Sequence, residues 1–288
     1  MSAERPGVRW TACTEAPRRT RFETLEGGSG AELFLAGRGS VRADAGGVAV
    51  SLADESARAE LAGLADGWGA ALWRALNGVF SFHGATLERD GFGLVLVGES
   101  RVGCSVTAVA LAADGWKLVA DGECPLRLEA DGSVTALPNG NGLEVDTALT
   151  LMGPIDRPTA PSGARRPRSE IAVPRAPGEC RISAIVEIRL ARSTDEPALV
   201  PAEKSELGAS GTLKLLCSTG EAILGRNSSL DERLDAFCES AVAGTPFVVA
   251  LVPEGRPGAF FPPSAVAGFI ADQVDGVEDL PAPPRGSL

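Results

Sequence analysis

An unbroken apolar run followed by a glycine-rich stretch constrains the fold of this chain more than any other feature. Phe92–Val97 is apolar at nearly every position, as expected of a strand buried on both faces. Gly98–Gly103 interrupts the run, and Cys104–Ala113 has the composition of a helix. Trp116–Asp121 then resembles a second buried strand that ends in a carboxylate. The order predicts a βαβ unit with a right-handed crossover.

The glycine stretch fits the phosphate-binding pattern G-x-x-x-x-G-K-[ST], the P-loop, at every position but one. Gly98 and Gly103 match its glycines, and Ser105 matches the hydroxyl residue that ligates Mg²⁺. Backbone N–H groups of such a loop, and the N-terminus of the helix after it, face phosphate oxygens. Cys104 stands where the lysine would reach the β- and γ-phosphates. Asp121 lies where a second-strand carboxylate holds Mg²⁺ in P-loop enzymes.

The surrounding sequence resembles the HPr kinase/phosphorylases and their kinase-like relatives. Those proteins carry a strand with His-Gly or His-Ala, a turn with glycines, the P-loop, a short helix ending in Arg/Lys-Gly, and a strand ending in Asp-Asp. The Ile185–Glu187 strand and the N-terminal region match more loosely. They resemble those relatives in which an extra domain precedes the kinase core. The matching stretches, with agreeing spacing, are Phe82-His83-Gly84, Gly91-Phe92-Gly93, Gly98 to Ser105, Ala112 to Trp116, and Leu118 to Gly122.

This resemblance implies an α/β, P-loop kinase-like sheet with flanking helices. It places His83 near the reacting phosphate. It makes Asp121 the catalytic acid/base or a group that orients the metal, with Ser105 and Asp121 as Mg²⁺ ligands. Besides Cys104, the chain departs from the family pattern at Gly122, which replaces the second aspartate.

Other residues could compensate for these two losses. Glu123 could replace the missing acid, since alternate residues of an extended segment project to one face, unless Gly122 bends the chain there. A cation could come from Arg101, Lys117, Arg165, Arg166, Arg168, Arg175 or Arg181. The residues expected around a nucleotide, ATP or another, are Gly98, Arg101, Gly103, Cys104 and Ser105, with Mg²⁺ accompanying any bound nucleotide.

Each feature also has a purely structural interpretation. The glycines could form an ordinary tight turn, His83 could be a hydrogen-bonded core residue, and Asp121 could cap a neighbouring helix. Cys104 could be an inert packed thiol, although a helix N-terminus lowers a thiol pKa. The arginine-rich segment could be a solvated surface.

Composition excludes several classes of function. The net charge of −11 and pI near 4.8 disfavour binding to nucleic acid and to anionic membranes. The sequence has no long apolar run that could span a membrane, and its first residues lack the apolar segment of a signal peptide. Six scattered cysteines without a C-x-x-C pair, and a single histidine, disfavour zinc and predict reduced thiols. We therefore expect a cytoplasmic protein.

We divide the chain into an N-terminal α+β module (1–78), an HPr kinase-like P-loop domain (79–277) and a flexible tail (278–288). The module should contain strands at 31–36 and 46–52 and a helix over 55–76, broken at Gly67. The domain should continue with a Pro-, Gly- and Arg-rich loop or lid (153–180), a strand at 182–190, a helix from Ser229, a strand at 245–252 and a helix at 263–274. The helix expected at 104–113 should turn Val106, Val109 and Ala110 inward.

Three functions remain open from the sequence. The first is a pseudokinase-type accessory or regulatory protein whose degenerate nucleotide site binds weakly or not at all, with a protein or peptide partner or a phosphate ligand. The second is an active ATP-dependent kinase acting on a serine or threonine hydroxyl of a protein, a peptide or a small molecule. The third is a thiol-based role for Cys104. Homo-oligomerisation is compatible with each.

Overall fold

The structure, a computed structural model, describes residues 7–13, 15–99, 102–140, 142–146, 168–191, 197–201, 208–217, 228–253 and 263–274. The chain divides into two compact units. One comprises Ala3–Ser81 with Cys217–Phe237; the other comprises Met1–Ser2, Phe82–Leu216 and Cys238–Leu288. The predicted domain boundaries at residues 78 and 277 stay predictions, and the predicted tail lies outside the described residues.

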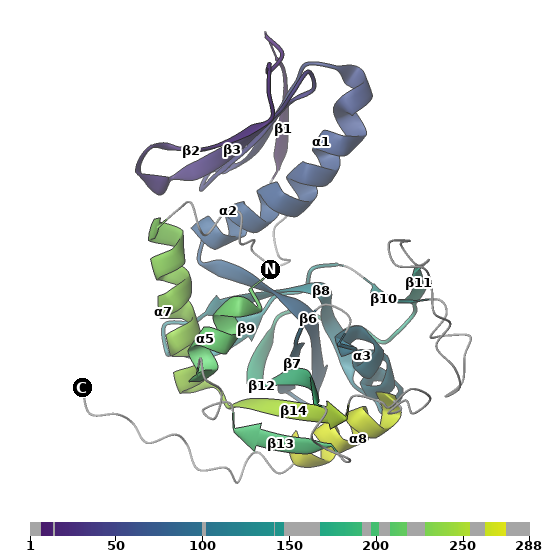
Figure 1. Ribbon diagram of the computed structural model, residues 1–288. Coiled ribbons are helices and arrows are strands. Elements are labelled where there is room, and N and C mark those ends of the chain that lie inside the picture. The colour runs from purple at the N-terminus through teal and green to yellow at the C-terminus, as the bar shows by residue number, and fades with distance from the viewer. Residues whose placement is uncertain are drawn as a thin grey trace, which may run out of the picture. The chain divides into compact units, whose positions relative to one another are not determined.

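The N-terminal unit is a five-stranded sheet with helices along one face (Figure 1). The strand order is β1-β5-β4-β3-β2, and only the β1–β5 pair is parallel. A helical stretch packs Leu61 and Leu72 into the core, and its predicted break at Gly67 is a π-helical turn, Ala65–Gly69. The remaining bounds are β1 Val8–Ala12, β2 Arg21–Thr24, β3 Gly30–Leu35, β4 Gly39–Asp44, β5 Gly47–Leu52, α1 Arg58–Leu64 and α2 Ala70–Leu76, with 3₁₀ turns at Glu26–Gly28 and Glu55–Ala57.

The second unit contains a seven-stranded sheet in the order β13-β14-β12-β7-β6-β8-β9. β9 also pairs with β12, so the strands from β12 to β9 close into a ring. β7 lies between β12 and β6, in the interior of the sheet as the apolar run predicted. The bounds are β6 Val79–Arg89, β7 Phe92–Val97, β8 Lys117–Leu128, β9 Val134–Ala136, β12 Cys180–Ala191, β13 Ala198–Pro201 and β14 Phe247–Pro253.

The geometry of the β6–β7 hairpin requires glycine at two positions of the matching stretches, Gly91 and Gly84. Its turn residues Asp90 and Gly91 have φ values of 53° and 87°, the left-handed pair that a two-residue Asp-Gly turn requires. At Gly84 the strands lie so close that a Cβ atom would sit 1.9 Å from the Leu96 carbonyl oxygen. Only glycine therefore fits after His83 without moving β7.

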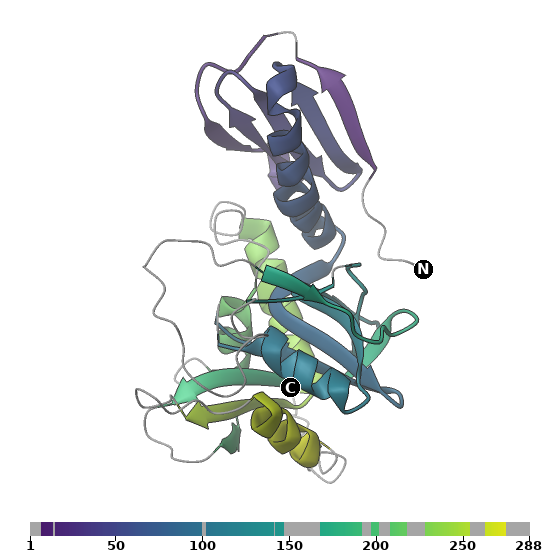
Figure 2. The ribbon, with the colours of Figure 1, turned by 90° about the vertical axis from the view of Figure 1, so that its right-hand side faces the viewer.

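Two helices, α3 (Cys104–Ala113) and α8 (Pro263–Val274), lie side by side against the large sheet in both views (Figures 1 and 2). Together with the strands they enclose the main core. The prediction that Val106, Val109 and Ala110 face inward on α3 holds only in part: all three are half-buried, and Val109 and Ala110 pack against the core cluster. The buried positions are Cys104, Thr107, Ala108, Leu111 and Ala112.

Other elements differ from prediction. β8 does not end at Asp121 but continues to Leu128. Arg168–Ile171, placed in the predicted loop or lid, forms strand β11 and pairs with β10 (Leu143–Asp146), because Pro and Gly around it hide a short extended stretch. Helix α5 (Gly208–Leu215) was not predicted, whereas α7 (Ser228–Gly244) was.

None of the described helices is long and apolar enough to cross a membrane. The predicted α/β class is confirmed.

Candidate functional site: the glycine loop and its carboxylates

The glycine loop joins the interior strand β7 to the N-terminus of α3. Gly98 lies against β12, where a Cβ atom would sit 2.7 Å from the Ile188 carbonyl oxygen, so the close approach requires glycine. Gly103 precedes the helix with φ 113°, a conformation that side chains rarely adopt. The first helical hydrogen bond runs from the Thr107 N–H to the Gly103 carbonyl. The N–H groups of a helix's first turn have no partner within the helix and are the groups that face an anion in a P-loop. Ser100 and Arg101 lie outside the described residues.

Ser105 and Asp121 meet as the pattern predicts. The Ser105 hydroxyl donates a 2.9 Å hydrogen bond to Oδ1 of Asp121, whose side chain is buried. Mg²⁺ is commonly held by one or two protein oxygens together with substrate phosphates and waters, so these two oxygens fit its requirements. Within the described part of the chain, no group of three or more His, Cys, Asp or Glu side chains could hold a metal by itself. A metal held by Ser105 and Asp121 would take its further oxygens from a bound phosphate or from water.

Gly122 interrupts the regular geometry of β8 directly after Asp121. Its φ of 78° is left-handed, yet the strand continues on either side. The Asn139 side chain spans this irregularity, with Nδ2 donating to the carbonyl oxygens of Asp121 at 2.8 Å and of Glu123 at 2.6 Å. The amide thereby fixes the backbone that presents Asp121. Asn139 was missed from the sequence because it lies 18 residues from Asp121.

The remaining predicted catalytic residues lie on strands next to the loop. Gly84 pairs with Val97 across the β6–β7 hairpin, so His83 is beside the point where β7 ends and the loop begins. The His83 N–H donates to the Leu216 carbonyl at 3.2 Å, and its side chain is half-buried. β8 continues through Glu123, as the hypothesis that Glu123 replaces the missing acid requires. The left-handed Gly122 directly before it is also present, and this is the irregularity expected to turn Glu123 away. The catalytic roles of both residues stay predictions.

Cys104, at the lysine position, is turned into the core. It is 7% exposed and packs with the helix–sheet cluster. Burial, followed by the charge of Asp121 and then that of Glu187, raises the pKa of the Cys104 thiol to about 12. A neutral thiol inside the core contributes no positive charge to a bound phosphate. The same features argue against a nucleophilic role, which needs an accessible thiolate.

We expect Cys104 to resist alkylation in the folded protein. Treatment with iodoacetamide near neutral pH, followed by peptide mass spectrometry, should label Cys13 first, since it is the one cysteine that is not buried. Cys104 should be labelled only after denaturation. Rapid labelling of Cys104 in the native state, at a rate matching Cys13, would restore the thiol-based hypothesis.

Glu187 and Arg189 form an ion pair beside the loop that sequence reasoning did not identify. Glu187 on β12 pairs in register with Val97, the last residue of β7. Its carboxylate is 6% exposed and accepts two hydrogen bonds of 2.8 Å from Nη2 of Arg189 and one of 3.0 Å from Nε. The available signal was weak: the Ile185–Glu187 stretch matches the family loosely, and nothing in the sequence shows which strand lies next to β7.

The cations proposed to compensate for the missing lysine lie at different places in the structure. Arg181 pairs with Asp131 at 3.6 Å, at the far end of β8. Lys117 begins β8, four residues and roughly 13 Å along the strand from Asp121. Arg175 donates to the Gly140 carbonyl at 3.5 Å, next to Asn139. Arg165 and Arg166 lie outside the described residues, and the side chain of Arg168 is likewise undescribed.

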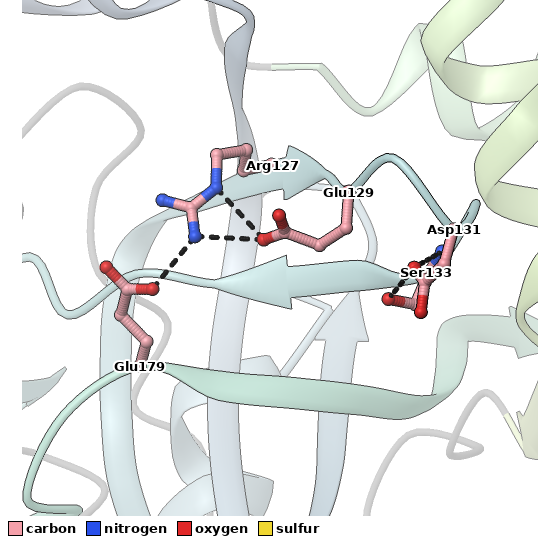
Figure 3. Close-up of polar contacts among 5 residues, drawn as sticks. All are labelled: Arg127, Glu129, Asp131, Ser133 and Glu179. Carbon is pink, nitrogen blue, oxygen red and sulfur yellow. Dashed lines mark hydrogen bonds and ion pairs between the residues drawn. The ribbon is translucent and has the colours of Figure 1, made fainter.

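A second arginine network lies at the other end of β8 (Figure 3). Arg127 donates from Nε to Glu129 at 3.0 Å and from Nη2 to Glu179 at 2.9 Å. The turn that follows contains Asp131, which accepts from the Ser133 hydroxyl at 2.6 Å. Arg127 is six residues, roughly 20 Å of strand, beyond Asp121. This network therefore resembles the Arg189 pair in chemistry but not in position.

Comparisons with known proteins add little to this geometry. No protein-family model matches the chain, and no curated protein matches it. Among solved structures, the chain is similar to the Hpr(Ser) kinase/phosphatase from Coxiella burnetii with a TM-score of 0.35 and 13% identity, covering 69% of this chain and 98% of that one. A match this distant leaves the function to be argued from the site.

Proposed function

We propose that this chain is an HPr kinase-like protein with a degenerate nucleotide site that serves as an accessory or regulatory protein rather than as a phosphotransferase. One observation carries the proposal: the residue at the lysine position is a buried, uncharged thiol directed into the core. The loop keeps both glycines of the pattern, Gly98 and Gly103, and Ser105 keeps its carboxylate partner. Losing a charge-stabilising donor costs roughly 10²–10³ in rate, and losing a charged one costs at least as much.

The partner of such a protein would be another protein, a peptide or a phosphate-bearing ligand. A glycine loop that lacks the lysine is expected to bind ATP or another nucleotide weakly, as a regulatory ligand. Mg²⁺ would lie at Ser105 and Asp121 when the phosphates supply its other ligands. We place its action in the cytoplasm. The net charge of −11 argues against nucleic acid as the partner.

An active ATP-dependent serine/threonine kinase is the second candidate. The observation in its favour is the intact Ser105–Asp121 hydrogen bond, with His83 on the adjoining strand. A phosphotransferase would need these groups and a cation supplied from elsewhere than position 104.

Calorimetry and a turnover assay separate the two candidates. We expect the wild-type chain to bind MgATP weakly or undetectably, and to show negligible Mg²⁺-dependent hydrolysis or phosphotransfer. The control is Asp121→Ala, which should leave the low background unchanged. Robust turnover by the wild type that Asp121→Ala abolishes would replace the accessory function with the kinase.

A further inference from the structure

Two buried carboxylates interact electrostatically with the side chain at position 104, where a P-loop has its lysine. Asp121 and Glu187 are 4% and 6% exposed, and the charges of both act on the Cys104 side chain. Asp121 is satisfied by the Ser105 hydroxyl. Glu187 is satisfied by Arg189, whose side chain is 43% exposed. Arg189 is thus a described cation that is hydrogen-bonded directly to this cluster.

The strand pairing brings Arg189 to the edge where the loop begins. β12 and β7 run parallel, so their carboxyl ends meet at the same edge of the sheet. Glu187 is opposite Val97, and the Ile188 carbonyl touches the Gly98 position. Arg189 is the next residue along β12 and therefore flanks the first residues of the glycine loop.

The hydrogen bonds of Arg189 leave one side of its guanidinium available. Nε and Nη2 both donate to Glu187, whereas Nη1 donates to no described residue. An arginine carries five N–H donors in a planar fork, so it can hold a carboxylate along one edge and an anion along another. Nη1 can therefore reach toward an anion without exposing a buried, unpaired Glu187.

We propose that Arg189 is the cation of the glycine-loop site, and that its guanidinium contacts the di- or triphosphate group of a ligand in place of the missing lysine. This inference rests on the proposed function, because it assumes that the loop still receives phosphate oxygens. Glu187 holds the side chain in place but also competes for its charge. The site is consequently weak, and in the wild-type chain its strength is set by the ion pair, because the Cys104 thiol contributes no charge.

Pyrophosphate without divalent metal is the suitable probe, since it tests the cation without the Mg²⁺ ligands. Amide chemical shifts of ¹⁵N-labelled full-length protein would be followed during titration at constant ionic strength. Arg189→Gln should weaken binding by about tenfold or more, as expected for a lost charge-assisted hydrogen bond. Arg189→Lys should be intermediate. Arg127→Gln is the matched control, because Arg127 is similarly paired and exposed but lies far along β8.

A second comparison guards against misfolding, since Arg189→Gln leaves the Glu187 carboxylate buried without its partner. Glu187→Gln alone frees Arg189 and should tighten pyrophosphate binding several-fold. The double variant, Glu187→Gln with Arg189→Gln, keeps a neutral pair of similar shape. It should bind pyrophosphate more weakly than Glu187→Gln alone and more weakly than the wild type. The two proteins differ only at residue 189.

The inference is overturned if Arg189→Gln binds pyrophosphate as the wild type does, or if Arg127→Gln weakens it equally. It is also overturned if the wild type shows no shifts at millimolar pyrophosphate. ATP turnover would be measured on the same proteins. Turnover by the wild type would remove the accessory function while the dependence on Arg189 still stood, so the two failures can be told apart.

Discussion

Replacing Trp116 with alanine should destabilise the unit that contains the seven-stranded sheet by about 3–5 kcal/mol, the cost expected for deleting a large buried aromatic side chain. Trp116 is fully buried and belongs to the main core. The Phe92 ring meets it edge-on with centroids 6.1 Å apart, and the Arg89 guanidinium lies 4.6 Å from its ring centroid. Truncation would leave a cavity where β7, β8 and α3 converge.

Two control variants separate size from chemistry. Trp116→Phe should cost much less, since the Trp116 Nε1 hydrogen is buried without a hydrogen-bond acceptor among the described residues. Trp10→Ala removes a tryptophan that is 37% exposed and covered by Arg58, so we expect a loss of about 1 kcal/mol or less.

Urea unfolding followed by circular dichroism would give the midpoints. Because two compact units need not unfold in one transition, hydrogen exchange of peptides from β7 and β5 would assign any loss to a unit. Trp116→Ala should speed exchange in β7 and leave β5 unchanged. Equal midpoints for Trp116→Ala and Trp10→Ala would contradict the placement of Trp116 in the core.

The βαβ region could be predicted because its signals are local. The apolar run at Phe92–Val97, the Asp90-Gly91 turn and the two glycines of the loop each act within a few residues of chain. The Ser105–Asp121 contact followed from the same order, since strand, loop, helix and strand bring these positions together.

Other features depend on contacts that sequence does not encode locally. The buried face of α3 is set by the strands and by α8, which follows about 150 residues later, so small residues such as Cys104 and Ala108 face inward instead of Val106. β12 becomes the neighbour of β7 across a separation of more than 80 residues, and this pairing alone brings Arg189 to the loop. Asn139 reaches Asp121 in the same way.

On the proposed function, the largest functional effect should come from introducing the two residues that the resembled pattern has and this chain lacks, a lysine at position 104 and an aspartate at position 122. Cys104→Lys places an ammonium group beside Asp121 and Glu187, whose charges favour it. The thiol, however, lies in the core, 3.5 Å from where a Cβ of Gly98 would be, so the longer side chain must leave that space. We expect stronger MgATP binding, by about tenfold, at a stability cost of about 1–3 kcal/mol. Turnover should stay low, because Gly122 still supplies no carboxylate.

Gly122→Asp has room but not a relaxed backbone. No heavy atom lies within 4 Å of the added Cβ, yet φ is 78°, which costs about 1–2 kcal/mol for a residue with a side chain. Asp and Asn tolerate this region better than most residues. Gly122→Asn therefore provides a matched control, with the same strain but no charge.

The test is ATP hydrolysis and phosphotransfer by the wild type, each single variant, and Cys104→Lys combined with Gly122→Asp or with Gly122→Asn. If the defect is shared between cation and acid, the Lys/Asp protein should exceed both single variants, by up to about 10²–10³ where each group stabilises the transition state. The Lys/Asn protein should gain binding but not rate. A Cys104→Met variant separates the charge of lysine from its length. Equal rates for the Lys/Asp and Lys/Asn proteins would mean that Gly122 is not where the acid was lost, and Glu123 or His83 would then be the group to replace next.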